Sequence, residues 1–250
     1  YYKGEYKWGA KHGYGVFVYR DETRFEGTFT NNVKEGQGIM YYSDGSKYVG
    51  DYHFGMMDGQ GEYVWPNGVK YIGEWRADER HGFGQMYFSD NGRDWLGDDS
   101  PACELNVVNQ EGSFYGYPYK HAKDVIDPEF GDMIPSVDKE FVDPIAELGA
   151  HVAPLGIAFY DSKEFPEKYH NSVFIALHGS WNRTKKSGYK VILVKLDDNG
   201  NYLYQEDFIT GWLSNETAWG RPAAPFVMSD GSLLVSDDKH NVIYKVQYKG

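Results

Sequence analysis

A 23-residue period runs through the first 88 residues, and it constrains the fold more than any other feature of the chain. Each unit opens with an aromatic-x-Gly triplet, places a second aromatic two residues after that glycine, and continues through Gly-x-Gly into an apolar stretch. The opening triplets are Tyr2-Lys3-Gly4, Phe25-Glu26-Gly27, Tyr48-Val49-Gly50 and Tyr71-Ile72-Gly73. A period kept over four copies predicts a repeat array in which neighbouring units share one core.

The pattern inside each unit predicts one β-hairpin. Aromatics such as Tyr48 and Tyr52 differ by an even number of positions in the sequence, so their side chains share one face of a strand. We expect this aromatic stripe to form the core of a sheet, with ligand stacking as the alternative. Gly-x-Gly allows positive φ and close approach of backbones. The dipeptides Asp44-Gly45 and Asn67-Gly68 predict turns between the two strands of a unit.

The position before each Gly-x-Gly carries a polar residue of varying type. Two of the four are histidines and two are carboxylates, so the position does not repeat one metal-ligating chemistry. We interpret these residues as turn residues rather than as a metal site. They are His12, Glu35, Asp58 and His81.

Residues 1–88 closely resemble the MORN repeat family on these motifs. The resemblance implies an elongated, single-layer antiparallel sheet. It also implies use as a scaffold, in dimerisation, or in contact with proteins and sometimes lipids.

Charge and cysteine content limit the classes of partner and site. The net charge is −12, and residues 89–250 hold 15 Lys and Arg against 25 Asp and Glu. Nucleic-acid binding needs a basic face, so no such partner is expected. The acidic half could hold a hard cation, with a solvated surface as the alternative. The single cysteine, Cys103, gives no disulfide framework or metal knuckle. Since the chain begins at Tyr1 inside a repeat, we interpret it as an incomplete product.

The second half has a different rhythm of strands and turns. Residues 120–150 predict a long, mostly irregular loop because prolines interrupt a charged stretch. Four strands are then expected at 155–160, 173–178, 189–196 and 202–208, and three more at 223–228, 233–236 and 242–248. Four-stranded antiparallel groups in series are typical of propeller blades. The chain is therefore predicted to be all-β, with a hairpin array over 1–88 and a partial β-propeller of about two to three blades over 89–250.

Several ordered motifs between residue 86 and the end closely resemble the glucose/sorbosone dehydrogenase family, which uses pyrroloquinoline quinone (PQQ). The resemblance implies a six-bladed propeller, a calcium ion that polarises the quinone, and hydride transfer from a sugar to PQQ. The motifs are Asn91-Gly92-Arg93-Asp94-Trp95-Leu96-Gly97-Asp98-Asp99, Glu104-Leu105-Asn106, His178-Gly179-Ser180-Trp181-Asn182-Arg183 and Trp219-Gly220-Arg221-Pro222.

The same resemblance implies roles for particular residues. Arg221 and His178 match positions that contact the cofactor, with a plain turn role for His178 as the alternative. Glu104 and Tyr115 resemble residues near a structural calcium site, through a carboxylate and a backbone carbonyl. The remaining cofactor-binding candidates would line the opening of the propeller where the cofactor lies. They are Trp181, Asn182 and Arg183.

No residue here matches the family's catalytic histidine, because MORN-like units stand where the earlier blades would be. The first functional hypothesis is therefore a PQQ- and Ca²⁺-binding sugar dehydrogenase-like fragment that acts on an aldose or sorbosone but is inactive alone. The alternative is a non-catalytic scaffold that binds a protein or lipid surface through the array. A homo-oligomer is one way to complete the propeller ring. By resemblance, the propeller half is expected in the periplasm or outside the cell.

Overall fold

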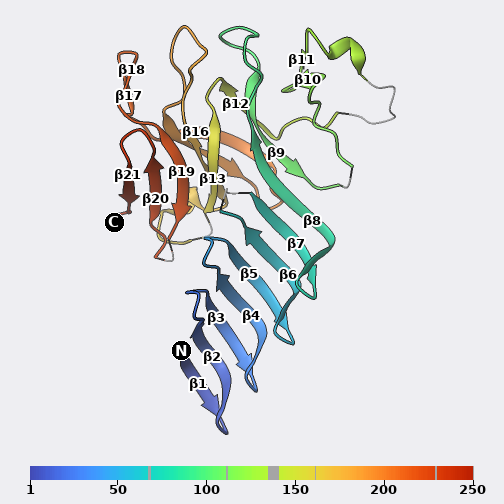
Figure 1. Ribbon diagram of the computed structural model, residues 1–250, viewed down its shortest axis with the longest axis vertical. Helices are drawn as coiled ribbons and strands as arrows, with labels where there is room; N and C mark the ends of the chain where they lie inside the picture. The colour runs from blue at the N-terminus through green and yellow to red at the C-terminus, as the bar shows by residue number, and fades with distance from the viewer. Residues whose placement is uncertain (67–68, 111, 135–140, 161, 229, 250) are drawn as a thin grey trace. The chain divides into compact units, whose positions relative to one another are not determined.

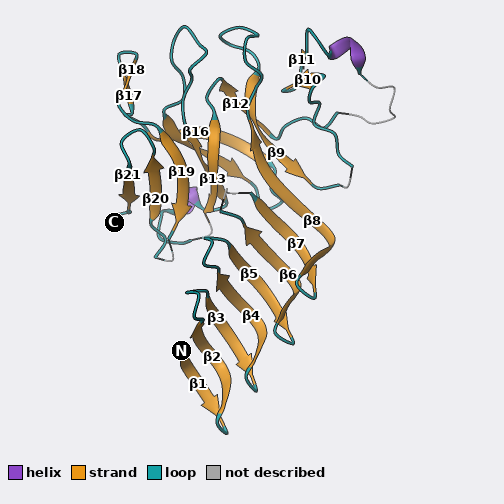
Figure 2. Ribbon diagram, viewed as in Figure 1, coloured by secondary structure: helices purple, strands orange, loops and turns teal. Residues whose placement is uncertain are grey.

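The computed structural model describes all residues except 67–68, 111, 135–140, 161, 229 and 250. The described residues are mainly strands, and their helices are two short 3-10 turns, η1 (Gly131–Met133) and η2 (Glu167–Tyr169) (Figures 1 and 2). The all-β prediction is confirmed. Two compact units are present, one made of Tyr1–Tyr87 with Val108–Gln110 and the other of Phe88–Val107 with Glu111–Gly250.

The first unit is an antiparallel sheet in which each strand pairs with the next one in the chain. Because every hairpin repeats the same pattern, the order in the sheet follows the order in the sequence. The predicted hairpin array is confirmed. Its strands are β1 (Tyr2–Lys7), β2 (Ala10–Val18), β3 (Arg24–Thr30), β4 (Val33–Tyr41), β5 (Lys47–His53), β6 (Met56–Val64), β7 (Lys70–Arg76) and β8 (Glu79–Asp90).

The turns inside each repeat differ from the prediction. The tight turns lie at residues 8–9, 31–32, 54–55 and 77–78, and both residues of each turn have positive φ, as in type I′ turns. Asp44-Gly45 instead joins β4 to β5, strands of neighbouring repeats, so its predicted place was wrong. Asn67-Gly68 lies outside the described residues. The tight turns were missed because Asn, Asp, Ala and aromatic residues adopt positive φ there without a shared sequence signal.

A continuous ladder of edge-to-face rings forms the core of the array. Ring centroids lie 5.0 Å apart between Phe25 and Tyr52, and 5.3 Å apart between Tyr48 and Tyr52. The ring of Phe25 covers Gly38 of the second strand, where any side chain would overlap it. This buried cluster confirms that the aromatic stripe is the core of the sheet.

The residues before Gly-x-Gly lie within strands β2, β4, β6 and β8, so their prediction as turn residues was wrong. Two of them, both carboxylates, instead accept hydrogen bonds from the tight turn of the following repeat. The carboxylate of Glu35 accepts a hydrogen bond from the backbone N–H of Phe54 (3.0 Å) and pairs with His53 (2.6 Å). Asp58 accepts one from the N–H of Ala77 (3.3 Å). A carboxylate at this position therefore stabilises the tight turn of the following hairpin.

The second unit contains the two strand groups predicted from the sequence. β13 (Pro154–Tyr160), β14 (Ser172–Leu177), β15 (Lys190–Leu196) and β16 (Tyr202–Ile209) form a four-stranded antiparallel sheet. A three-stranded sheet follows. Residues of both sheets share one buried core, for example Phe174, Leu193 and Val235. The strands of the second sheet are β19 (Pro222–Val227), β20 (Leu233–Asp237) and β21 (Val242–Val246).

The described parts of the stretch 120–150, residues 120–134 and 141–150, contain more regular structure than predicted. They contain β12, which pairs with β9, and a small hairpin of β10 and β11. A second small hairpin, of β17 and β18, was not predicted, because two-residue strands carry no periodicity. The bounds are β9 (Ala102–Val108), β10 (Lys120–His121), β11 (Val125–Ile126), β12 (Ala146–Ala150), β17 (Leu213–Ser214) and β18 (Thr217–Ala218).

Candidate functional site

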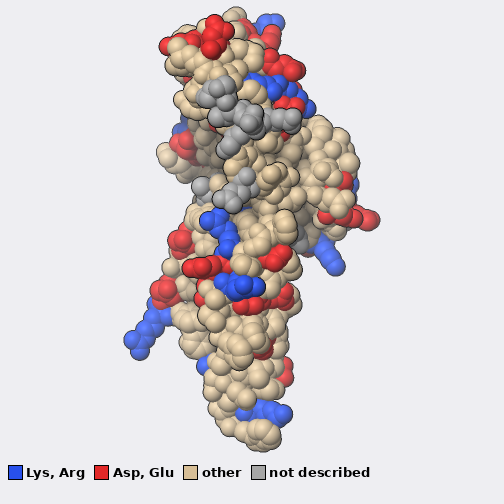
Figure 3. All heavy atoms as spheres, turned by 90° about the vertical axis from the view of Figure 1, so that its right-hand side faces the viewer, with Lys and Arg blue, Asp and Glu red and all other residues tan. Residues whose placement is uncertain are grey.

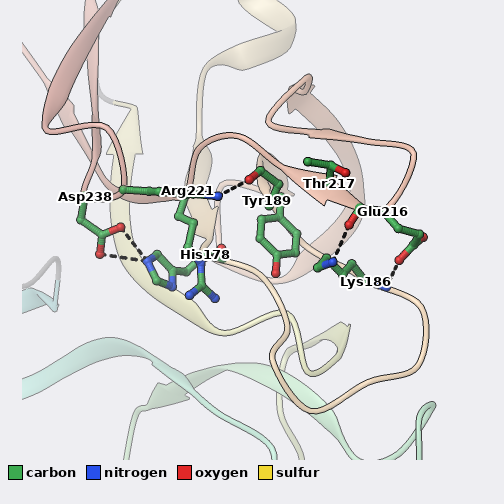
Figure 4. Close-up of a pocket in the computed structure, with 9 residues that line it drawn as sticks. His178, Lys186, Tyr189, Glu216, Thr217, Arg221 and Asp238 are labelled. Carbon is green, nitrogen blue, oxygen red and sulfur yellow. Dashed lines mark hydrogen bonds and ion pairs between the residues drawn. The ribbon is translucent and has the colours of Figure 1, made fainter.

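A pocket of about 730 Å³ lies in the second unit, where loops from several strands converge (Figure 4). One side comes from the connection between β14 and β15, and the other from the β17–β18 hairpin and the residues flanking β19 and β20. All of these segments follow or precede strands of the two packed sheets. The residues lining the pocket are His178, Lys186, Tyr189, Glu216, Thr217, Ala218, Arg221, Asp238 and Lys239.

His178 stands directly after β14 and forms one wall of the pocket. Its Nε2 lies 3.0 and 2.9 Å from the two carboxylate oxygens of Asp238, which follows β20. Figure 4 shows the imidazole facing this carboxylate. Asp238, which lies at the end of a strand of the other sheet, therefore fixes the orientation of the His178 ring.

Arg221 is held in place by backbone carbonyls. Its Nε donates a hydrogen bond to the carbonyl of His178 (3.2 Å), and its Nη2 donates to that of Gly179 (2.6 Å). The guanidinium lies 5.5 Å from the centre of the Tyr189 ring, close enough for a cation–π contact. These two bonds use only part of the arginine donor set, so the group can still bind an anion.

The pocket carries a positive balance in an acidic part of the chain. Lys186, Arg221 and Lys239 outnumber the carboxylates of Glu216 and Asp238. The backbone N–H of Lys186 donates to Glu216 (2.7 Å). Residues 89–250 have a net charge of −10, so a local excess of cations favours an anionic ligand here.

The other three predicted cofactor contacts lie outside the pocket lining. Trp181 is 68% exposed and packs edge-on against another tryptophan at 5.6 Å. Asn182 and Arg183 hydrogen-bond to aspartates at 3.3 and 2.6 Å. Their assignment to the cofactor stays a prediction. The three partners, in order, are Trp95, Asp94 and Asp99.

Sequence reasoning missed most of the pocket. Tyr189, Asp238 and Lys239 each stand at the end of a strand that the pattern predicted correctly. Polar or aromatic residues at strand ends were therefore the available signal. Their convergence depends on the packing of two sheets, which the sequence pattern does not specify.

The side chains of Glu104 and Tyr115, the predicted calcium residues, each bond to other groups of the protein. The buried carboxylate of Glu104 accepts hydrogen bonds from the amide of Asn106 (2.9 Å) and the N–H of Ala122 (2.6 Å), and burial raises the pKa of Glu104. The hydroxyl of Tyr115 donates to the carbonyl of Val107 (2.7 Å). Ca²⁺ takes about six to eight oxygen ligands. Among the described residues, no group of three or more acidic, His or Cys side chains could hold a metal, and calcium at Glu104 and the Tyr115 carbonyl stays a prediction.

No single large patch of one charge lies among the described residues on the face shown in Figure 3. Acidic and basic side chains are interspersed on this face. Over the described residues, no helix is long and apolar enough to cross a membrane.

This arrangement defines an all-β protein that combines a hairpin array with two packed antiparallel sheets and a pocket with an excess of cationic side chains. Family models match both parts. Residues 2–24, 25–47, 48–70 and 71–93 match the MORN repeat, and residues 135–249 match the TrAA12-like family. The chain thus carries four MORN repeats followed by a TrAA12-like segment.

A curated relative is an uncharacterized protein of Borreliella burgdorferi, 42% identical over 170 residues. The match covers 66% of this chain and 44% of the relative, so the chain spans less than half the length of that protein.

Solved structures share the fold. The calcium structure of Carbohydrate-Active Enzymes Family AA12 from Trichoderma reesei has a TM-score of 0.53 at 14% identity, covering 100% of this chain and 95% of that one. The iodide structure of the same protein gives 0.52 at 14% identity, covering 100% and 96%. The holo pyranose dehydrogenase PQQ domain from Coprinopsis cinerea gives 0.48 at 15% identity, covering 96% and 93%, a score too low to support a shared fold. At these identities the likeness concerns the fold alone.

Proposed function

We propose that residues 89–250 are a partial propeller of the PQQ-dependent sugar dehydrogenase type, and that its pocket binds PQQ. The observation that carries the proposal is the positive balance of the pocket around Tyr189 and Arg221. A planar quinone with three carboxylates needs cations at its edge and a flat surface against its ring. The cationic side chains of the pocket supply the first requirement, whereas the ring of Tyr189 is only 4% exposed and lies 5.5 Å from the Arg221 guanidinium.

Each residue has a distinct role in this proposal. Arg221, fixed by two carbonyls, binds a carboxylate, and Lys186 and Lys239 add ammonium donors at the pocket edge. The buried ring of Tyr189 helps to position the Arg221 guanidinium, which lies 5.5 Å from its centre. His178, oriented by Asp238, donates or accepts a hydrogen bond at the wall. Bound PQQ supplies the hydride acceptor for oxidation of a sugar.

The fragment lacks a residue assigned as general base for the sugar hydroxyl. We therefore expect this chain to bind the cofactor without turning over alone. An aldose or sorbosone-type sugar is the proposed substrate of the completed protein, with the periplasm or the outside of the cell as its location. Self-association or a further segment would complete the ring. No step is assigned to calcium.

Calorimetric titration of PQQ into the chain tests the pocket. Replacing Arg221 by Ala removes a charged hydrogen bond, so affinity should fall about 10- to 100-fold. Arg221→Lys should recover part of it, and the exposed Arg76→Ala variant is the matched control.

Three results count against the proposal. PQQ that gives no saturable heat, or binds wild type and Arg221→Ala equally, removes the assigned site. Reduction of a dye by the isolated chain with PQQ and an aldose contradicts the expected inactivity, with Ca²⁺ added in a parallel assay.

A second candidate function rests on the aromatic face of the array. A cavity of about 340 Å³ there is lined by Lys11, Lys34, Phe17 and Phe29, among others. The ammonium of Lys34 lies 4.5 Å from the centre of the Tyr52 ring. Two lysines beside the aromatic core favour an anionic surface, so the alternative is a scaffold that binds anionic lipid. Such binding should not depend on PQQ.

A further inference from the structure

Two tryptophans on the surface of the second unit are left open to water. Trp95 is 76% exposed and Trp181 68% exposed. Their ring centroids lie 5.6 Å apart, with an angle of 84° between the ring planes. Indole rings are among the largest apolar groups in proteins, and an exposed pair of them marks a binding surface more often than a lone exposed residue does.

Polar contacts on both sides hold this pair in position. Each of the three residues after Trp181 bonds an aspartate close to Trp95 in the sequence. The amide of Asn182 donates at 3.3 Å, the guanidinium of Arg183 at 2.6 Å, and the backbone N–H of Thr184 at 3.1 Å. The acceptors are Asp94, Asp99 and Asp98, respectively. These three hydrogen bonds, rather than burial, hold the two rings in position before a ligand binds.

The backbone at Trp95 supports a role beyond folding. Its φ is +70°, in the left-handed region that bulky residues rarely adopt. The buried His151 contacts the carbonyl of Gly97 through Nε2 (2.7 Å), which stabilises the same loop. Strained conformations that the surroundings hold in place cluster at ligand sites. A glycine would adopt this positive φ without strain if the loop needed only a turn. Trp95 adopts it and exposes an indole ring at the surface.

We propose that Trp95 and Trp181 form a stacking site for the neutral sugar rings of an oligosaccharide. The C–H face of a pyranose carries partial positive charge, which suits the negative face of an indole. Carboxylates and amides beside the rings accept and donate hydrogen bonds to sugar hydroxyls. The three aspartate carboxylates outnumber the single cation of Arg183, so the local charge disfavours an anionic ligand. An apolar ligand is disfavoured as well, because it would remove water from those carboxylates at a cost in free energy.

The position of Trp181 in the chain connects this site to the pocket. Trp181 lies on the connection between β14 and β15, between His178 and Lys186, which both line the pocket. This step rests on the proposed function. If a sugar end reaches the pocket, the tryptophans lie where further units of the same chain extend. The substrate class is then an oligosaccharide rather than a free monosaccharide.

Fluorescence and calorimetric titrations with cellohexaose and maltohexaose test the stacking site without PQQ. At least one hexasaccharide should bind wild type, and glucose should bind more weakly. Each of Trp95→Ala and Trp181→Ala should weaken binding about two- to tenfold, and the double variant should abolish it. Trp8→Ala in the array, 93% exposed, is the matched control and should bind as wild type.

Three results would overturn the inference. The first is absence of binding by both hexasaccharides. The second is unchanged binding in the double variant. The third is saturable binding of choline that competes with the sugar and is lost in the same variants, which would indicate a cation cage.

PQQ titration of the wild type, compared with its hexasaccharide titration, separates the two proposals. If hexasaccharide binds but PQQ does not bind wild type, the cofactor proposal fails and the stacking site stands. If PQQ binds but no hexasaccharide does, the stacking site fails and the cofactor proposal stands.

Discussion

At the residue scale, one buried carboxylate shows how a single side chain can organise a stretch that has little regular structure. The side chain of Asp127 is fully buried. It accepts hydrogen bonds from Arg93, from the Nε2 of His121 (2.8 Å) and from the backbone N–H groups of Glu129 (2.9 Å) and Phe130 (2.8 Å). The hydrogen bond from Arg93, followed by that from His121 and the backbone bonds, holds the pKa of Asp127 well below its usual range.

Because the folded pKa of Asp127 is depressed, its contribution to stability is present above the unfolded pKa and lost below it. The free energy of unfolding should therefore fall as pH drops below about 3.9, toward the folded pKa. Asp127→Asn should flatten this acid-limb dependence in urea unfolding measured between neutral pH and acid. The exposed Asp124→Asn variant is the control. An equal acid slope for wild type and Asp127→Asn would contradict this role.

The same residue explains why sequence reasoning misread residues 120–150. β10 and β11 have two residues each, too short to show periodicity. Their hairpin is held by the bond of Asp127 with Arg93, which is distant in the sequence. A second bond, of Glu104 with the N–H of Ala122, also joins residues distant in the sequence. Prolines and charges were visible, but these remote hydrogen bonds were not.

At the element scale, the repeat hairpin depends on a ring that covers a glycine. Phe25 of β3 is completely buried and lies over Gly38 of β4. On the other strand, Gly27 faces Gly38, and a Cβ at Gly27 would come 2.7 Å from the Gly38 Cα. Both glycines are needed because two backbones and a ring share the same space.

A double-variant cycle on Gly38 and Phe25 tests this contact. Gly38→Ala should lower the free energy of unfolding by about 1–3 kcal/mol, because its methyl overlaps the ring. Phe25→Ala should cost about 3–5 kcal/mol through the cavity it leaves. The double variant should cost less than the sum, by about 0.5–3 kcal/mol, since the methyl then occupies freed space.

Urea denaturation gives all four free energies, with the exposed Thr30→Ala in β3 as control. Additive costs for the two substitutions would show that the ring and the glycine are not coupled.

Strands were the elements best predicted from the sequence. The array was readable because the same ring-and-glycine contact recurs in every repeat. Seven of the nine strands between residues 154 and 246 were predicted, because runs of apolar residues lie between clear turns; the other two are the two-residue strands β17 and β18. The tight turns of the repeats were not readable, since positive φ is adopted there by several residue types.

At the scale of the whole molecule, the candidate site was only partly predictable. Motifs identified His178 and Arg221, which do line the pocket, whereas Asp238 and Tyr189 were missed. The pairing of Trp181 with Trp95 was also missed. Motifs report residues one at a time, while a site depends on which loops the packed sheets bring together.

The scaffold alternative makes a prediction for the intact chain. Vesicles of phosphatidylcholine with phosphatidylserine should cosediment with wild type, and added salt should weaken binding. Lys11→Ser and Lys34→Ser should each lower affinity about fivefold, from about 1 kcal/mol per lysine near an anionic surface. PQQ should not change the result. Lys3→Ser is the control, because Lys3 is exposed and outside the cavity lining.

Vesicle binding that is equal in Lys3→Ser and Lys34→Ser would remove the cavity as the contact. Binding that appears only with PQQ would argue against an independent scaffold function of the array.

The ring-on-glycine contact has a consequence for how the array can change over evolutionary time. Tyr2, Phe25, Tyr48 and Tyr71 each cover the equivalent glycine of their own repeat, at Gly15, Gly38, Gly61 and Gly84. Neighbouring repeats meet through the same edge-to-face ring pairs. Gene duplication or deletion of whole repeats would therefore preserve every contact of this kind. Arrays of different length can thus arise in frame, and homologues are expected to differ by complete repeats rather than by parts of one.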